Sequence, residues 1–199
     1  MPTDASIRFF DAQFRRQVVE HDYRLNPFEA AALPHLRGRV LDYGCGLGNL
    51  ALAAARGGCE VVALDASPAA IEHLREAARQ ESLAIDAQEC DLRTYVLREQ
   101  FDCVVCIGLL MFFDCEAALA QLRSLQDHVR PGGVAVVNVL VEGTTYHAMF
   151  DPSGYCLFAP QQLEERFAGW NISACAQDNF PAPGNTMKCF STVIARKPE

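Results

Sequence analysis

The sequence feature that most restricts the fold is a glycine-rich turn between a short apolar run and an Ala- and Leu-rich segment. Residues 40–48 read VLDYGCGLG, which places glycines at Gly44, Gly46 and Gly48. Because glycine has no Cβ atom, such a turn lets the backbone approach a ligand closely. We therefore expect a strand, a ligand-binding turn and a helix in this order, with Cys45 as a small residue inside the turn.

After Gly38 the chain alternates short aliphatic or β-branched runs with helical patterns. This alternation predicts parallel strands joined by helical crossovers. Ser67 followed by Pro68 is typical of a helix cap with proline at the first helical position. The expected strands are residues 39–42, 60–64, 83–89, 101–107 and 134–140, and the expected helices are 50–56, 68–80 and 115–129.

The two ends of the chain depart from this alternation. Residues 1–38 have helical spacing, and Asn26 before Pro27 predicts a helix start. A stretch with glycine and proline at 142–160 precedes a helix expected around 161–167. Two strand-like runs, 171–176 and 188–195, flank a Pro- and Gly-rich separator, which predicts an antiparallel hairpin. The fold class is therefore α/β: a doubly wound sheet of seven strands, mostly parallel, with helices on both faces.

Composition excludes several classes of partner. The chain has 25 acidic and 17 basic residues, a formal charge of −8 and no dense Lys/Arg cluster, so we expect no nucleic-acid partner. The most apolar run, 101–113, falls short of the roughly 20 residues that span a bilayer. Residues 1–10 do not resemble a signal peptide. We expect a cytoplasmic protein with no membrane partner, and the composition leaves the oligomeric state open.

Nine cysteines, an odd number, are spread along the chain, many in apolar contexts. This pattern favours reduced thiols over a disulfide framework. Cys103 and Cys106 have the C-x-x-C spacing of some redox and zinc sites. Residues three apart on a strand point to opposite faces, and no second C-x-x-C exists, so we expect structural thiols and no metal site.

Three acidic residues stand at the ends of successive expected strands: Asp42, Asp65 and Asp91. Such strand ends converge on the switch-point crevice of a doubly wound sheet. Beside the glycine turn, Asp42 opposes phosphate groups but suits a zwitterionic ligand that carries an ammonium group. Asp65 is placed to accept hydrogen bonds from both hydroxyls of a ribose, and Asp91 to meet an adenine edge. An alternative for Asp91 is the cap of a following short helix.

These motifs, with Phe101-Asp102-x-Val-Val and the Pro131-Gly132-Gly133 turn, resemble those of class I S-adenosylmethionine-dependent methyltransferases over residues 39–140. The resemblance implies a Rossmann-like sheet whose antiparallel C-terminal hairpin strand separates it from dehydrogenases. It implies one domain over 1–199, with an N-terminal helical cover (1–38), a cofactor-binding core (39–140) and a substrate-side loop, helix and hairpin (141–199). By this resemblance the S-adenosyl-L-methionine site comprises Asp42, Gly44, Cys45, Gly46, Asp65, Ala66, Asp91, Leu92, Ile107, Gly108 and Leu109.

Residues 109–113 (LLMFF) and 191–197 (STVIARK) are most similar to the tellurite-resistance methyltransferases. One difference is the final hairpin loop, where the His-Arg pair of that family has no counterpart in residues 180–187. Tellurite and selenite therefore do not follow as methyl acceptors from the resemblance.

The expected reaction is methyl transfer to a small-molecule nucleophile. The sulfonium activates its own methyl group, so the protein mainly aligns the acceptor and excludes water. We expect Met111, Phe112 and Tyr155 to contact the substrate, and Tyr146 and His147 to be the residues placed for catalysis, with His147 as a base. For His147 the alternative is a merely exposed or structural loop histidine.

Two rival functions fit the same order of strand, glycines and acids. One is a nucleotide-dependent oxidoreductase, although the spacing Gly-x-Gly-x-Gly differs from the dinucleotide fingerprint Gly-x-Gly-x-x-Gly. The other is a non-catalytic regulator that binds the cofactor without turnover. Phe9, Phe10 and Phe14 form either a cover over the cofactor or an ordinary apolar helix face.

Overall fold

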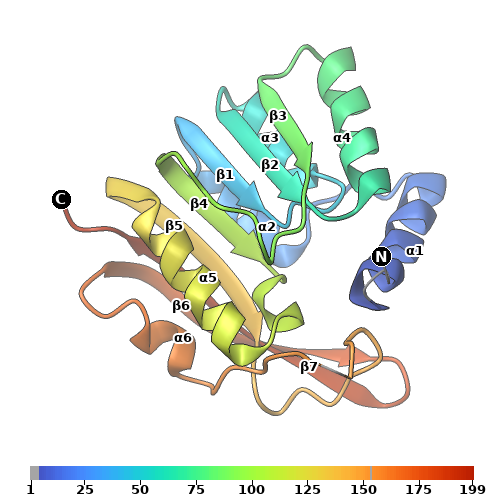
Figure 1. The fold of residues 1–199 in the computed structure, drawn as a ribbon, viewed down its shortest axis with the longest axis vertical. Coiled ribbons are helices and arrows are strands. Elements are labelled where there is room, and N and C mark those ends of the chain that lie inside the picture. The colour runs from blue at the N-terminus through green and yellow to red at the C-terminus, as the bar shows by residue number, and fades with distance from the viewer. Residues whose placement is uncertain (1–4, 153) are drawn as a thin grey trace.

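A computed structural model describes residues 5–152 and 154–199 and contains one seven-stranded sheet (Figure 1). Its strand order is β3-β2-β1-β4-β5-β7-β6. The first five strands pair in parallel, and β7 pairs antiparallel with both β5 and β6. The strands are β1 (Arg39–Tyr43), β2 (Glu60–Asp65), β3 (Ile85–Glu89), β4 (Phe101–Ile107), β5 (Val129–Leu140), β6 (Asn171–Ala182) and β7 (Thr186–Arg196). The predicted mostly parallel sheet with an antiparallel C-terminal hairpin is confirmed.

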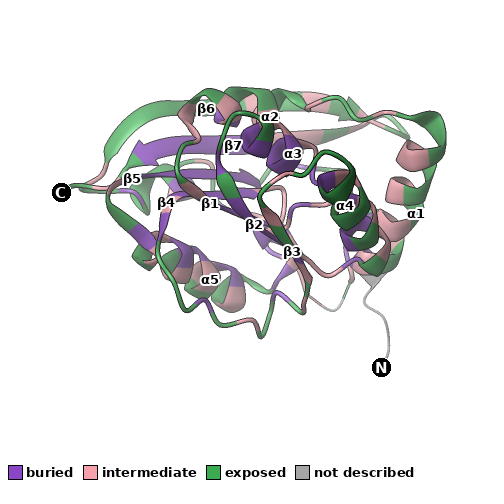
Figure 2. Ribbon diagram, turned by 90° about the horizontal axis from the view of Figure 1, so that it is seen from above, coloured by how far each residue is buried: buried purple, intermediate pink, exposed green. Residues whose placement is uncertain are grey.

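Helices cover both faces of the sheet, as expected. They are α1 (Ala5–Glu20), α2 (Pro27–Ala32), α3 (Asn49–Arg56), α4 (Pro68–Gln80), α5 (Cys115–Asp127) and α6 (Gln162–Glu165), with short 3-10 turns η1 (Leu33–His35) and η2 (Leu110–Phe112). One core cluster joins α5 and α6 to the sheet, and the other joins α2, α3 and α4 to the opposite face. In Figure 2 the central strands β1, β4 and β5 are mostly buried between these layers, whereas the edge strand β6 is largely exposed. No helix within the described residues is long and apolar enough to cross a bilayer.

The helix starts follow their capping residues. The Asn26 side chain accepts hydrogen bonds from the backbone N–H groups of Phe28 and Glu29, and the Glu29 carboxylate accepts from the Asn26 N–H at 2.8 Å. Ser67 caps α4 in the same manner by accepting from the Ala70 N–H. Both predicted caps are confirmed, because each supplies an acceptor to N–H groups that have no partner within the helix.

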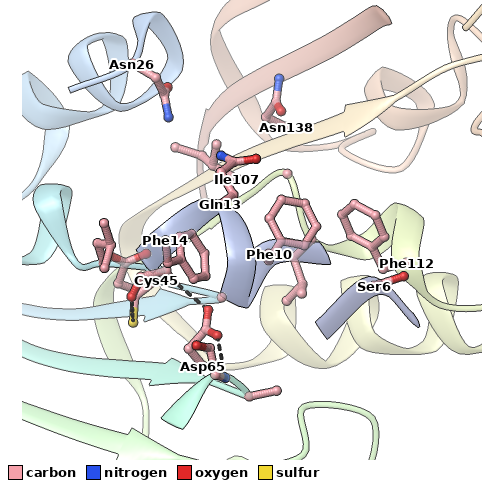
Figure 3. Close-up of a pocket in the computed structure, with 18 of the residues that line it drawn as sticks. Ser6, Phe10, Gln13, Phe14, Asn26, Cys45, Asp65, Ile107, Phe112 and Asn138 are labelled. Carbon is pink, nitrogen blue, oxygen red and sulfur yellow. Dashed lines mark hydrogen bonds between the residues drawn. The ribbon is translucent and has the colours of Figure 1, made fainter. Parts of the chain in front are cut away.

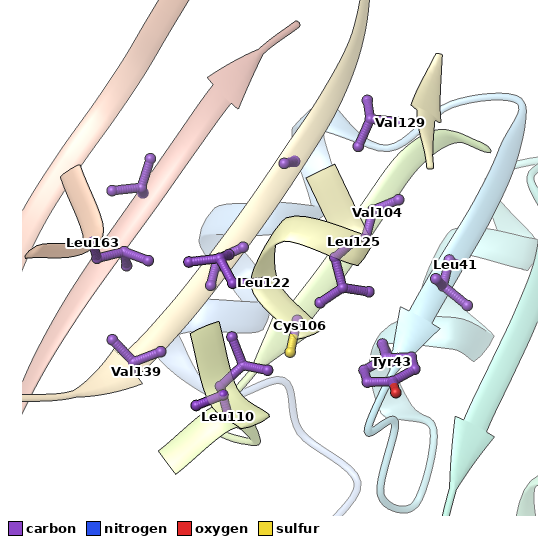
Figure 4. Packing of buried hydrophobic residues seen from close by; sticks show 14 of the residues in the cluster. Leu41, Tyr43, Val104, Cys106, Leu110, Leu122, Leu125, Val129, Val139 and Leu163 are labelled. Carbon is purple, nitrogen blue, oxygen red and sulfur yellow. The ribbon is translucent and has the colours of Figure 1, made fainter. Parts of the chain in front are cut away.

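Alternate residues of β4 pack on opposite faces of the sheet. Cys106 lies in the cluster with Leu122 and Leu125 of α5 (Figure 4), whereas Cys103 lies in the cluster on the other face. Both thiols are buried, and the described residues contain no group of histidine, cysteine or acidic side chains able to hold a metal ion. The interpretation of these thiols as structural residues on opposite faces agrees with this packing.

Several element boundaries differ from the predicted ones. β5 begins at Val129, which pairs with Phe101 before a register shift, so the preceding helix ends at Asp127 and not at 129. β6 extends to Ala182 because it is an edge strand that pairs with one neighbour only. Pro181, which has no N–H group to donate, therefore interrupts no pairing with a second strand. The helix expected around 161–167 is shorter, at Gln162–Glu165.

The expectation that all thiols are reduced is wrong for one pair. Cys115 and Cys156 form a disulfide with a Cα–Cα distance of 4.7 Å and a sequence separation of 41. The Cys156 N–H donates to the Met111 carbonyl at 3.0 Å, which brings the returning loop against the start of α5. This loop contact pairs two cysteines that are far apart in the sequence, while the other seven are free.

Candidate functional site

A cavity of about 420 Å³ lies beyond the carboxyl ends of the parallel strands. Its floor comes from the ends of β1, β2 and β4 and from the glycine turn, and its walls come from α1, α2, β5 and β7. The position is the switch point of the sheet, where the chain proceeds from β1 to β2 on one side and to β4 on the other. Its volume is in the range of small-molecule sites, roughly 300–1,000 Å³.

The glycine turn has a backbone conformation that requires glycine. Gly44 has a φ of 83°, and a Cβ atom there would lie 2.9 Å from the Leu109 side chain. Gly46 has a φ of 53°, and its Cβ would lie 3.1 Å from the Phe14 ring of α1. Because these glycines have no Cβ atoms, the loop after β4 and helix α1 can both pack closely against the turn.

Asp42 lines the cavity with a buried carboxyl group, one oxygen of which has no partner among the described residues. The residue is 6% exposed, and its Oδ2 atom has no hydrogen bond among the described residues. Burial, with added repulsion from Glu29 and Asp65, raises the pKa of Asp42 to about 8. A buried carboxylate of this kind is stabilised when a cationic ligand approaches it.

Asp65 connects the glycine turn to the loop after β2. Its carboxylate accepts hydrogen bonds from the N–H groups of Gly46 at 2.8 Å and Ser67 at 2.9 Å (Figure 3). Burial nevertheless raises the pKa of Asp65. The Ser67 hydroxyl in turn hydrogen-bonds to Asp11 of α1. Asp65 thus holds the site together and still lines the cavity, where its oxygens have further lone pairs to offer.

Asp91 lines the cavity next to the buried side chain of Leu92. Its carboxylate accepts from the Arg93 N–H at 3.1 Å and from the Arg93 guanidinium at 2.9 Å. This guanidinium lowers the pKa of Asp91. The Thr94 N–H donates to the Asp91 carbonyl, so Asp91 both organises a turn and faces the cavity.

Helix α1 closes one side of the cavity with aromatic side chains. Phe10 and Phe14 line it, and the Phe10 ring lies edge-on to Phe112 with the centroids 5.0 Å apart (Figure 3). Phe9 packs instead with the cluster around Met111. Phe10 and Phe14 therefore lie where a cover over the cavity was expected, and Phe9 does not.

Most of the residues predicted for the site come together in this cavity. The lining contains every residue expected at the cofactor and two of those expected at the substrate: Asp42, Gly44, Cys45, Gly46, Asp65, Ala66, Asp91, Leu92, Ile107, Gly108, Leu109, Met111 and Phe112.

Tyr146, His147 and Tyr155 were also expected above the strand ends, but they are not among the lining residues. His147 is exposed, and its Nε2 atom lies 3.0 Å from the Thr144 carbonyl oxygen. The Tyr155 ring stacks on Phe150, which belongs to a cluster beside the cavity. The Tyr146 N–H donates to the carbonyl of residue 187, and this bond ties the loop to β7.

Sequence reasoning missed one wall of the cavity. This wall comprises Phe28 and Glu29 of α2, Asn138 of β5, and Lys188 and Phe190 of β7. One signal was available: Asn138 is the single polar residue in the run 134–140 (VAVVNVL), which forms a buried strand. A buried amide in such a strand requires a partner or a ligand.

Residues 40–133 match the model of a family described as a methyltransferase domain. Over this segment and in its fold, the chain is similar to class I S-adenosylmethionine-dependent methyltransferases. Among curated proteins, this chain is 27% identical over 168 residues to "Hemagglutinin 1" of Eikenella corrodens, covering 80% of the chain and 55% of that protein. It is 26% identical over 166 residues to "Probable S-adenosyl-L-methionine-dependent methyltransferase TehB" of Haemophilus influenzae (strain 10810), covering 80% and 57%. The chain spans little more than half the length of these relatives.

Solved structures confirm the fold of this chain. TehB from Haemophilus influenzae superposes with a TM-score of 0.75 at 22% identity, over 87% of this chain and 62% of that chain. The N-methyltransferase NodS from Bradyrhizobium japonicum WM9, in complex with S-adenosyl-l-homocysteine, superposes with a TM-score of 0.69 at 17% identity, over 96% and 99%. The narrower resemblance to the tellurite-resistance methyltransferases agrees with the TehB proteins among these relatives.

Proposed function

We propose that this chain transfers the methyl group of S-adenosylmethionine to a small-molecule acceptor. The observation that carries the proposal is the buried Oδ2 of Asp42, which has no partner in the part of the chain that the structure describes and lies beside the glycine turn. A further buried oxygen of the cavity lining, Oδ1 of Asn49, also has no partner among the described residues. Both oxygens can accept hydrogen bonds, and the cofactor carries ammonium and hydroxyl donors. The residues present therefore fit this cofactor.

Each part of the cofactor has a group of matching chemistry in the cavity. Asp42 and the turn at Gly44 and Gly46 would hold the methionine end, since a carboxylate attracts its ammonium group. Asp65 would accept from the ribose hydroxyls with the lone pairs that its backbone hydrogen bonds leave free. The adenine would lie against Leu92, with Asp91 at its edge and the segment 107–109 on the other side.

The bound cofactor supplies an activated methyl group on its sulfonium. The protein then needs to align the acceptor and to keep water out of the site. Phe10 and Phe14 serve the second purpose, because their rings cover the cavity from α1. The lining contains no histidine and no tyrosine among the described residues, which favours an acceptor that reacts without a dedicated base.

A small acceptor is favoured by the enclosure of the site. The same cavity of about 420 Å³ must hold both cofactor and acceptor, and α1 and α2 cover it. The net charge of −8 disfavours a nucleic-acid substrate.

Calorimetry with S-adenosylhomocysteine tests cofactor binding directly. We expect Asp42→Asn to weaken binding by about tenfold or more, since it removes a charge-assisted bond to the ammonium group. Asp86→Asn, a change at an exposed carboxylate of β3 outside the cavity, is the matched control and should bind like the unaltered protein. Absence of binding by the folded, unaltered protein would refute the proposal.

A further inference from the structure

One wall of the cavity is built from side chains on a single face of β5 and β7. The strands pair antiparallel with Asn138 opposite Thr192 and Leu140 opposite Phe190. Side chains two residues apart on a strand share a face, so Lys188 extends the same row on β7. Asn138, Leu140, Phe190 and Lys188 all line the cavity.

This wall is separate from the part of the cavity assigned to the cofactor's ribose. Asp65 ends β2 and Asn138 lies on β5, with β1 and β4 between them in the sheet. Three strand spacings amount to about 14 Å. In Figure 3 the two residues lie well apart, with Ile107 of β4 between them. The wall therefore belongs to the acceptor side.

The inner end of the wall is a hydrogen-bond acceptor. Asn138 is fully buried, and its Nδ2 atom donates to the Thr192 hydroxyl at 2.9 Å. Its Oδ1 atom has no partner among the described residues. An amide oxygen left without a donor in an apolar strand costs free energy, which a ligand N–H group would offset.

The outer end of the wall is a cation. Lys188 is partly buried, and its Nζ atom lies 4.9 Å from the centre of the Tyr146 ring. Within the part of the chain that the structure describes, no carboxylate forms a salt bridge with it. Burial lowers the pKa of Lys188. An anionic group of a ligand would stabilise its charged form.

Between these two ends the wall is apolar and aromatic. Phe190 lies against Phe28 of α2 with the ring centroids 4.8 Å apart, and buried Met149 completes this part of the lining. Aromatic rings and a thioether form favourable contacts with a flat aromatic ligand.

We propose, on the basis of the proposed methyltransferase function, that the acceptor is a small aromatic amine carrying a carboxylate at the far end of its ring. Its amino group donates to Asn138, its ring lies against Phe28 and Phe190, and its carboxylate pairs with Lys188. The positions opposite Asn138 and at Lys188 are four residues apart on β7, about 13 Å along the strand. A benzene ring with substituents at opposite ends and two hydrogen bonds of about 2.8 Å have a length of that order.

An arylamine also suits a lining in which the described residues include no histidine or tyrosine, because it is neutral near pH 7 and has a free lone pair. The nitrogen lone pair forms the bond to the methyl carbon, and the carbon–sulfur bond breaks with its electrons passing to sulfur. The products are the neutral thioether of the cofactor and an N-methylated arylammonium ion. This ion then releases its extra proton to water, so atoms and charge balance.

The test uses 4-aminobenzoate as the probe, with aniline and 4-hydroxybenzoate as matched comparisons. We expect 4-aminobenzoate to be N-methylated with a kcat/KM about tenfold or more above that of either comparison compound. Lys188→Met should remove the advantage over aniline, mainly through KM, and Lys188→Arg should restore it. Arg123→Met, which removes an exposed cation outside the cavity, should leave the advantage unchanged.

Asn138→Leu should lower kcat/KM for 4-aminobenzoate by about tenfold while leaving the affinity for S-adenosylhomocysteine unchanged. Thr192→Val, which removes only the partner that orients the amide, should have a smaller effect in the same direction. If Asn138→Leu does not fold, the lysine variants still decide the question. Cofactor binding without a preference for 4-aminobenzoate over aniline overturns this inference alone. If the unaltered protein does not bind S-adenosylhomocysteine, the proposed function is overturned as well.

Discussion

Replacing Asp42 with asparagine should make the free protein more stable while weakening its hold on the cofactor. The carboxyl group of Asp42 has a pKa of about 8 in the folded protein, against an ordinary value of 3.8, chiefly because it is buried. Between these two pH values the unfolded chain has released the proton and the folded chain still holds it. The folded state therefore loses stability as the pH rises, by about 1.4 kcal/mol per unit.

The size of the effect follows from this window. Below about pH 3.8 Asp42 imposes no penalty, at pH 5 it costs about 2 kcal/mol, at pH 7 about 4 kcal/mol, and above pH 8 the cost no longer grows. The asparagine side chain has no such proton to lose. The variant should therefore exceed the unaltered protein in free energy of unfolding by an amount that increases between pH 5 and pH 7.

Urea denaturation at pH 5, 6 and 7 measures this difference, with Asp86→Asn as the control at an exposed carboxylate. At one high concentration of S-adenosylhomocysteine, both proteins should gain stability, and the unaltered protein should gain about 1.4 kcal/mol more than Asp42→Asn for a tenfold difference in affinity. A stability difference that stays constant across these pH values would refute the reasoning, since it would mean that Asp42 ionises in the folded protein without cost.

Three further predictions concern the same site and the fold. The affinity for S-adenosylhomocysteine should rise about tenfold from pH 6 to pH 7, because the ammonium group binds the ionised form of Asp42, and calorimetry in buffers of different ionisation enthalpy should detect the released proton. Gly44→Ala should abolish measurable cofactor binding, whereas Gly184→Ala, at another positive φ but in open space, should cost only about 1 kcal/mol in urea denaturation. Replacing Cys115 and Cys156 with serine should lower the free energy of unfolding by up to about 4 kcal/mol, since the disulfide closes a loop of 41 residues; unchanged stability in urea would contradict this.

The parallel half of the fold was predictable because its signals are local. The strand at 39–43, the turn at Gly44 and the cap at Ser67 each follow from residues within a few positions of one another. The three acids could be placed together because the ends of parallel strands meet at one edge of the sheet. The residues that line the cavity near those strand ends are therefore among those predicted from the sequence.

The cavity wall on β5 and β7 was not predictable in the same way, because it depends on pairing between segments that are distant in the sequence. Asn138 lies on the same wall as Lys188 and Phe190 because of the register in which β5 pairs with β7. Hydrophobic periodicity does not specify this register. His147 and Tyr155 stood at plausible positions in the sequence, but their loop packs against its own aromatic residues instead. The disulfide between Cys115 and Cys156 has the same origin, since a loop contact alone brings the two together.

Helix α1 encloses the cavity through side chains, with Phe10 against Phe112 and Ser67 bonded to Asp11. On the proposed function, the demethylated cofactor would leave past this helix before another donor molecule binds. If this product release is slower than methyl transfer, it limits kcat to the same value for all reactive acceptors. Acceptors of very different nucleophilicity would then share a maximal velocity and differ only in the concentration needed to reach it.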